Sequence, residues 1–275
     1  MNQKELAIST MVLALGALGC SSDTTARQGA LPWDDGHTQV VGPNGEVVDV
    51  ATPEGDGCLK VGEEFADPAN CIKPQDECES RAADVLLDTD GKVLDTLCYP
   101  AEGTISVAQL EASDGGVAQN QNNSVIVLDS NPDVDVAGDL SVDANNVYIY
   151  GDSPDTSVVD GDLTLDGNNA VVRGVRITGD VTVVKNDATF FYCVIEGNLT
   201  ITGNNTVIAG CDVLGTLTIM GNNSKLVGNH LVHAPEIDGK GTQCDANLSA
   251  EDKDQSGTLE DSELGAPIQC GEKGK

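Results

Sequence analysis

The chain is poor in basic and aromatic residues. Its 275 residues include 14 Lys and Arg against 45 Asp and Glu, which gives a formal net charge of −31. This excess repels nucleic acid and anionic headgroups, so it excludes a nucleic-acid partner and favours association with cations. Aromatic residues make up only 3% of the chain, so a core must be built from Val, Ile and Leu. There are three His, and no CxxC or His-rich spacing predicts a zinc site.

The first 20 residues, MNQKELAISTMVLALGALGC, predict export. The apolar run from Leu6 to Leu18 is too short to span a bilayer and fits the hydrophobic region of a signal peptide. The ending ALGC resembles the bacterial lipobox, which implies lipidation of Cys20 and attachment to the outer membrane. The expected location is therefore the bacterial cell envelope, on the outer membrane or the cell surface. A plain secretory signal with a nearby cleavage site is the alternative.

Residues 21–37 lack periodicity and predict a flexible linker.

Residues 38–100 predict a small β module. Two stretches there, at 39–50 and 85–97, each have two aliphatic runs around an Asn-Gly or Asp-Gly turn, which predicts two β-hairpins. So small a region has little core, and disulfides would compensate. Nine cysteines less Cys20 leave an even number, as expected in an oxidising compartment. The four in this module are Cys58, Cys71, Cys78 and Cys98.

Residues 101–238 contain a repeat of 18 to 23 residues. Each unit has two aliphatic columns on either side of a hydroxyl column, as in Leu199, Thr200 and Ile201, so the aliphatics should face inward. A fixed period of this length predicts a β-solenoid of about six coils. Asn side chains stacked about 4.8 Å apart should hydrogen-bond between coils. The Asn pairs are Asn122–Asn123, Asn145–Asn146, Asn168–Asn169, Asn186–Asp187, Asn204–Asn205 and Asn222–Asn223.

This Asn-rich repeat resembles the right-handed parallel β-helix of the pectate-lyase-like group. The resemblance implies an all-β fold and says little about function. A left-handed hexapeptide helix is the alternative, because 18 is also three sixes. Cys193 and Cys211 are 18 residues apart, hence in one column of adjacent coils. That spacing allows either a disulfide or two free buried thiols.

The sequence DKDQSGTLEDSE, residues 252–263, resembles the EF-hand calcium loop and lies in a C-terminal segment, 239–275. The resemblance implies a Ca²⁺ site of the weak, dockerin-like extracellular type, between short helices. Gly257 would supply the bend and Leu259 the apolar eighth position. Cys244 and Cys270 bracket the loop and are expected to pair. The implied ligands are Asp252, Asp254, Ser256, Thr258 through its carbonyl, Glu260, and Glu263 bidentately.

Two functions are compatible with these features. The first is a lipid-anchored, calcium-binding surface protein with a structural, adhesive or glycan-binding role, whose partner would be a surface glycan or protein. The second is a carbohydrate-active enzyme, a polysaccharide lyase or hydrolase, using the acidic column of Asp139, Asp162 and Asp180. No residue is predicted to be catalytic. The coils around 163–214 carry no long loops, so their outer faces are expected to be bare.

Overall fold

A computed structural model of the chain describes residues 38–41, 47–50, 78, 83–87, 92–100, 104–108, 110–113, 116–128, 136–268 and 270. The predicted signal peptide, the lipidation site Cys20, the linker, and Cys58 and Cys71 lie outside these residues. Within the described part of the chain, no helix has the length and hydropathy needed to cross a bilayer.

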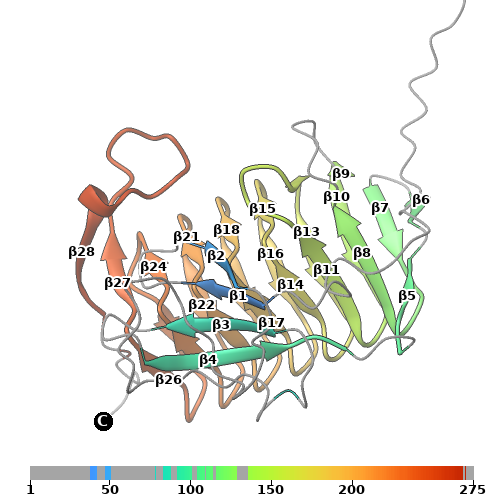
Figure 1. Ribbon diagram of the computed structural model, residues 1–275, viewed down its shortest axis with the longest axis horizontal. Coiled ribbons are helices and arrows are strands. Elements are labelled where there is room, and N and C mark those ends of the chain that lie inside the picture. Colours follow the sequence, from blue (N-terminus) through green and yellow to red (C-terminus); the bar gives the residue numbers. More distant parts are fainter. Residues whose placement is uncertain are drawn as a thin grey trace, which may run out of the picture.

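Three mostly parallel sheets surround one core and form a β-helix, in which successive coils lie side by side along the long axis (Figure 1). Sheet I contains β6 (Glu111–Ser113), β7 (Gly116–Gln119), β10 (Asp139–Val142), β13 (Leu163–Leu165), β16 (Val181–Val183), β19 (Leu199–Ile201), β22 (Leu217–Ile219) and β25 (Glu236–Ile237). Sheet II contains β5 (Ser106–Val107), β8 (Ser124–Leu128), β11 (Val147–Gly151), β14 (Val171–Arg173), β17 (Thr189–Phe191), β20 (Val207–Ala209), β23 (Lys225–Val227) and β26 (Gln243–Asp245). Sheet III contains β9 (Val136–Ala137), β12 (Val158–Asp160), β15 (Arg176–Ile177), β18 (Val194–Ile195), β21 (Asp212–Val213), β24 (His230–Leu231), β27 (Leu248–Ala250) and β28 (Leu264–Pro267).

The strand register confirms the predicted columns. Leu199 pairs with Val181 on one side and Leu217 on the other, while Thr200 pairs with the threonines of the same two coils. Leu199 and Ile201 are fully buried, and Thr200 between them is half-buried. Aliphatic side chains therefore stack inside the solenoid and hydroxyls line its outer face, as the alternation predicts.

The Asn pairs form two ladders at the corner between sheets I and II. The Oδ1 atom of Asn186 accepts hydrogen bonds from the backbone N–H of Asn204 at 3.0 Å and from its side-chain amide at 2.9 Å. The second member of each pair is left-handed, with φ of 53° at Asn123 and 62° at Asp187. Asn and Asp adopt this conformation more easily than other residues with a side chain. The predicted Asn stacking is confirmed, and the turn explains why these residues recur.

The solenoid extends past the predicted end at residue 238. Strands β25, β26 and β27 form a further coil that reaches Ala250, so the described residues from 116 to 250 make seven coils rather than six. This coil has no Asn pair, because Lys240 and Gly241 occupy the corner. The N–H of Lys240 donates to Asn222 Oδ1 at 3.0 Å, and Gly241 takes the left-handed conformation with φ of 73°.

The N-terminal module forms a four-stranded sheet in the order β2-β1-β3-β4. Its strands are β1 (Thr38–Val41), β2 (Val47–Val50), β3 (Ala83–Leu87) and β4 (Val93–Cys98). The pairs β1–β2 and β3–β4 are antiparallel, which confirms both predicted hairpins, and β1 pairs with β3 in parallel. A disulfide joins Cys78 to Cys98.

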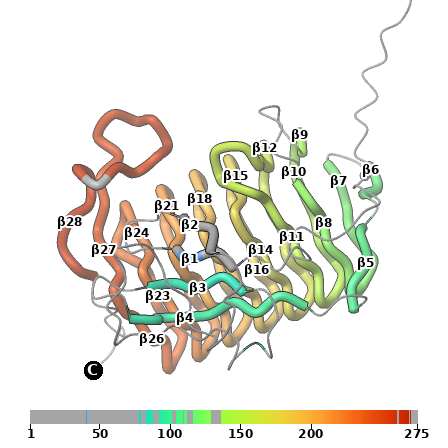
Figure 2. Tube along the Cα trace, in the orientation of Figure 1, coloured from blue at the N-terminus to red at the C-terminus, as the bar shows by residue number. Residues whose placement is uncertain are grey.

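This module covers the outer face of sheet II. Strands β3 and β4 run across the solenoid strands, along the long axis (Figure 2). Leu86 packs in one buried cluster with Phe191, Ala209 and Val227, which belong to three successive coils. The expectation of a bare outer face around these coils is wrong for sheet II, because the apolar outward residues of β17, β20 and β23 are buried by β3.

Candidate metal centre

The loop 251–263 connects β27 to β28, and a disulfide joins Cys244 to Cys270 around it. The predicted flanking helices are wrong. β27 and β28 pair with each other in antiparallel fashion, and only a 3₁₀ turn, η1 (Asp261–Glu263), precedes β28. The chain enters the loop from the last coil in an extended conformation, with β27 already hydrogen-bonded to β24, so it has no length in which to begin a helix.

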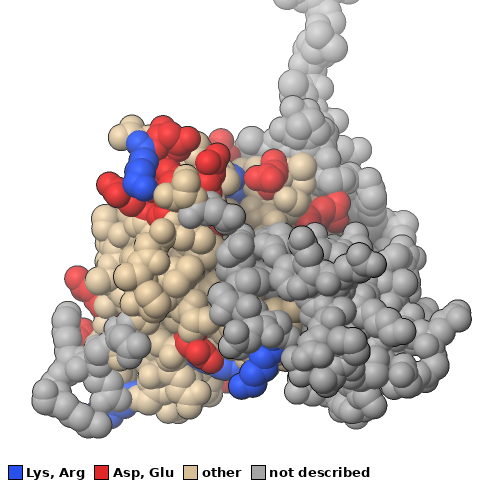
Figure 3. All heavy atoms as spheres, turned by 60° about the vertical axis from the view of Figure 1, so that its left-hand side comes forward, with Lys and Arg blue, Asp and Glu red and all other residues tan. Residues whose placement is uncertain are grey.

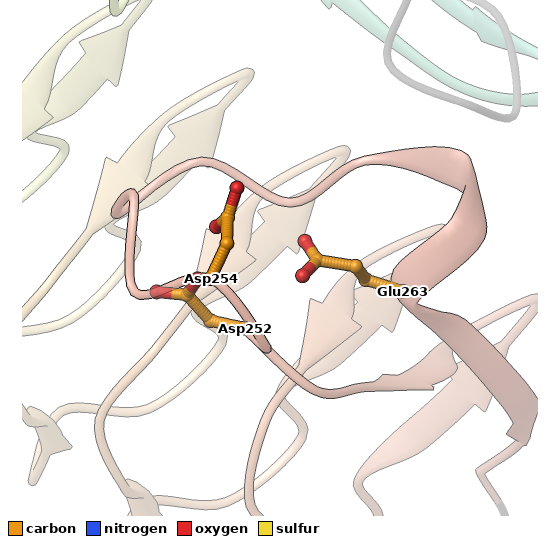
Figure 4. Close-up of side chains that lie close together, drawn as sticks. All are labelled: Asp252, Asp254 and Glu263. Atoms are coloured by element: carbon orange, nitrogen blue, oxygen red, sulfur yellow. The ribbon is translucent and has the colours of Figure 1, made fainter.

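The loop brings three of the predicted ligands together. One oxygen from each of Asp252, Asp254 and Glu263 lies within 4.8 Å of the others. Glu263 extends from η1 across the loop toward the two aspartates (Figure 4). Carboxylates so close to one another repel, and a bound cation relieves that repulsion.

The start of the loop is shaped by hydrogen bonds to its own carboxylates. Asp252 accepts from the backbone N–H groups of Ser256 at 3.1 Å and Gly257 at 3.2 Å, and Asp254 accepts from Ser256 at 3.0 Å. Hydrogen bonds from the side chain and backbone of Ser256 lower the pKa of Asp254, so it is ionised at neutral pH. Gly257 has a φ of 74°, which confirms the predicted bend at the glycine.

Glu263 closes the loop from the other side, and its side chain is only 7% exposed. One carboxylate oxygen accepts the backbone N–H of Lys253 at 2.7 Å, and the other accepts that of Glu260 at 3.1 Å. Within the described residues, no ion pair involves the three clustered carboxylates. A buried carboxylate without a cationic partner is costly, so this donor set fits a bound cation.

The other three predicted ligands lie along the same loop. The Ser256 hydroxyl donates to the Thr258 carbonyl at 3.0 Å, so these two oxygens face each other within the loop. Glu260 contributes its backbone N–H to Glu263, and its side chain is exposed and lies outside the carboxylate cluster. Acidic side chains gather where this loop projects and are sparse on the flank below it (Figure 3).

The structure adds a residue that the sequence analysis missed, Arg176 of β15. Its guanidinium donates to the Gly257 carbonyl at 2.8 Å and to Thr258 Oγ1 at 3.1 Å, and it forms an ion pair with Glu196 at 2.8 Å. These contacts hold the tip of the loop against the outer face of sheet III. The two partners lie 81 and 82 residues away in the sequence, so no local pattern indicates them.

Two other predicted features have structural roles. Cys193 and Cys211 are free thiols, both buried, which decides between the two alternatives in favour of free thiols. They extend a buried ladder in which the Cys211 N–H donates to Asn229 Oδ1 at 2.9 Å.

In the acidic column, Asp139 accepts the backbone N–H of Asp162 at 2.9 Å, and each later member does the same for the next coil.

Comparison of the chain with models of protein families, with curated proteins and with solved structures found no match in any of the three.

Proposed function

We propose that the loop 252–263 binds Ca²⁺ in the manner of an EF-hand or dockerin loop, and that the ion stabilises the C-terminal end of an exported β-solenoid. The observation that carries this proposal is the convergence of Asp252, Asp254 and Glu263, at the first, third and twelfth positions of that motif. Hard oxygen ligands with several carboxylates favour Ca²⁺ over softer metals.

Each side chain would have a defined part in holding the ion. Asp252 and Asp254 would each offer one oxygen, and Glu263 both oxygens, while the Ser256 hydroxyl and the Thr258 carbonyl would complete the near side. Glu260 would act directly or through water. The buried position of Glu263 fixes its carboxylate before the ion arrives, which lowers the entropy that binding must overcome.

We propose a surface role for the whole protein. A lipid on Cys20, followed by the linker 21–37, would attach it to the bacterial outer membrane, and the rigid solenoid of the pectate-lyase-like, right-handed type would act structurally or as an adhesin for a glycan or protein. The net charge of −31 supports an extracellular, calcium-rich setting. The stacked aliphatic core gives mechanical continuity between coils.

Calorimetric titration of the full chain with CaCl₂ tests the metal site. Wild type should bind one ion with a Kd of about 10⁻⁴–10⁻³ M. Glu263→Gln should weaken binding at least tenfold, roughly the effect of losing one charged ligand interaction. Glu251→Gln removes the same charge from an exposed neighbour outside the loop motif and should change the Kd less than about threefold, as a screened surface charge does. The absence of binding heat in wild type, or equal weakening by both variants, would refute the proposal.

A further inference from the structure

A small pocket lies between sheet III and the tip of the loop 252–263, which we call the metal loop. Its volume is about 160 Å³, well below the 300–1,000 Å³ or so of pockets that bury drug-sized ligands, so it suits one ring-sized group. Three parts of the chain form its wall. They are the loop tip at Leu259, the loop at Asp155, and coil residues that include Arg176, Tyr192, Val194 and Asp212.

The aromatic residue in this wall occupies a position that the fold assigns to glycine. At the corner between sheets II and III, a left-handed residue recurs every 18 residues, and it is glycine in three of the five coils. Tyr192, with φ of 51°, stands between glycines with φ of 66° and 59°. The positions are Gly174, Tyr192, Gly210, Gly228 and Ala246. A bulky side chain in this conformation is strained, and such strain is retained where the side chain has a use.

The carboxylate of Asp212 in this pocket is held by a hydrogen bond to His230. Asp212 Oδ1 lies 2.8 Å from His230 Nδ1, and the Asp212 side chain is 20% exposed. The Nε2 atom of His230 is buried and has no hydrogen-bond partner in the described part of the chain. The only described polar contact of that imidazole is therefore the one that orients Asp212. Among the described residues, the side-chain contacts of Asp212 run through its Oδ1 atom alone, so its second oxygen is available to a ligand.

The arginine of the pocket is fully engaged by protein groups. Its N–H groups contact Pro154 O at 3.2 Å, Glu196 Oε1 at 2.8 Å, Gly257 O at 2.8 Å, Thr258 Oγ1 at 3.1 Å and Asp155 Oδ1 at 3.7 Å. Four of the five N–H groups of this guanidinium donate hydrogen bonds to the protein and the fifth faces the Asp155 carboxylate, so the group is not free to recognise an anion. Arg176 instead joins the three parts of the wall, and the carboxylates of Glu196 and Asp155 offset its charge.

The groups that remain are those that bind a hydroxylated ring. Asp212 accepts hydrogen bonds, and the Tyr192 phenol, which also hydrogen-bonds Ser153, can both donate and accept. Burial and then the charge of Asp155 raise the pKa of Tyr192, so the phenol keeps its proton. Val194, Leu259 and the aromatic ring supply apolar surface for the C–H face of a sugar.

We propose that this pocket binds one neutral sugar residue, with Asp212 and Tyr192 as its contacts and the metal loop as one wall. The site goes beyond the proposed calcium binding and does not depend on it, because Arg176 holds the loop in place. Tyr192 also packs beside the buried cluster around Leu86, so the test must separate binding from packing.

Saturation-transfer NMR on the full chain can make this separation. The probes are glucose, galactose and N-acetylglucosamine, with galacturonate as the anionic and butylammonium as the cationic comparison. At least one neutral sugar should give a signal, and Asp212→Asn should weaken its binding about tenfold or more, as expected for loss of a charged hydrogen-bond acceptor. Tyr192→Gly should abolish the signal yet leave the protein folded, because glycine is the residue of the neighbouring coils. Asp238→Asn, on an exposed corner, should change nothing.

Several results would overturn the proposal. These are the absence of signal from every neutral sugar, a signal only from butylammonium or galacturonate, or unchanged sugar binding in both pocket variants. A protein that binds calcium but none of the sugars would refute the pocket and leave the metal site standing. Tyr192→Phe keeps the packing of the ring and removes only the hydroxyl, so it should weaken sugar binding and leave the protein folded.

Discussion

Arg173 of β14 and Asp84 of β3 form an ion pair with a 2.8 Å Nε–Oδ2 distance, and their side chains are 1% and 2% exposed. The pair joins the N-terminal module to the third coil across 89 residues of sequence. Tyr99 donates its hydroxyl to the same carboxylate, and the guanidinium lies 4.8 Å from the ring centroid of Tyr150. The guanidinium also donates to the Gly151 carbonyl at 2.7 Å, so both charges are well compensated.

Removing one member of this pair should detach the module. Arg173→Leu leaves Asp84 buried without its cation, a change that costs about 3–5 kcal/mol in buried pairs. Urea denaturation followed by circular dichroism should show this loss, and Asp84→Leu combined with Arg173→Leu should recover part of it. Lys225→Ala removes a more exposed pair with Asp95 and should cost at most about 1 kcal/mol. Equal losses of unfolding free energy in Arg173→Leu and Lys225→Ala would contradict the role of the Arg173–Asp84 pair in docking the module.

The repeat could be predicted from sequence because each coil stacks on an equivalent one. Leu199 lies on Leu217 and Asn204 on Asn186, so one periodic pattern specifies both the coil and its register. The last coil escaped prediction because its corner uses Lys240 and Gly241. The corner of that coil still needs a residue in the left-handed conformation, and Gly241 supplies it in place of Asn.

The contacts that the solenoid makes with the N-terminal module and with the metal loop could not be predicted in the same way. Arg173 and Arg176 lie on the successive strands β14 and β15 of one coil, and the sequence shows them only as scarce basic residues. One docks the N-terminal module and the other docks the metal loop. The convergence of the three carboxylates could be predicted because the resemblance to an EF-hand loop lies in twelve consecutive residues. The strands β27 and β28, which take the place of the expected helices, follow from the attachment of the loop to the solenoid.

The Tyr99 phenol predicts a loss of stability at alkaline pH. Burial, followed by the charge of Asp84, raises the pKa of Tyr99 well above its usual value of 10. An unfolded tyrosine loses its proton near pH 10, whereas the folded one keeps it. The stabilisation is therefore complete below about pH 10 and is lost as pH rises through the folded pKa. Urea unfolding at stepped pH should show this decline, with a shallower slope in Tyr99→Phe than in wild type.

Cys193 and Cys211 should resist modification until the solenoid unfolds. Both thiols are buried, and burial raises the pKa of Cys211 well above that of an exposed thiol. Iodoacetamide should therefore alkylate neither in the native protein and both in denaturant, without any reductant. Mass spectrometry of the digested protein can follow this, with the Cys244–Cys270 peptide as a control that needs reduction first. A peptide that stays unalkylated in denaturant would mean that Cys193 and Cys211 are joined.

Arg176 should control how tightly the metal loop lies on sheet III. Arg176→Gln removes the hydrogen bonds to Gly257 and Thr258 and the ion pair with Glu196. Loss of charged hydrogen bonds at a partly exposed site should cost about 2 kcal/mol, which makes the loop open roughly 30-fold more often. Trypsin cleavage after the exposed Lys253 reports this opening directly, because cleavage of a transiently open segment follows its population.

The matched control for this experiment is Lys185→Gln, which breaks an exposed pair with Asp166 just beyond the strands of sheet I and leaves the loop untouched. Its cleavage rate at Lys253 should equal that of wild type. If the proposed site binds calcium, the ion should slow cleavage in all three proteins, because it would hold Asp252, Asp254 and Glu263 together whether or not the loop is docked. If Arg176→Gln is cleaved at the wild-type rate in chelator, the loop is held by its own hydrogen bonds and by the Cys244–Cys270 disulfide, and Arg176 has no part in placing it.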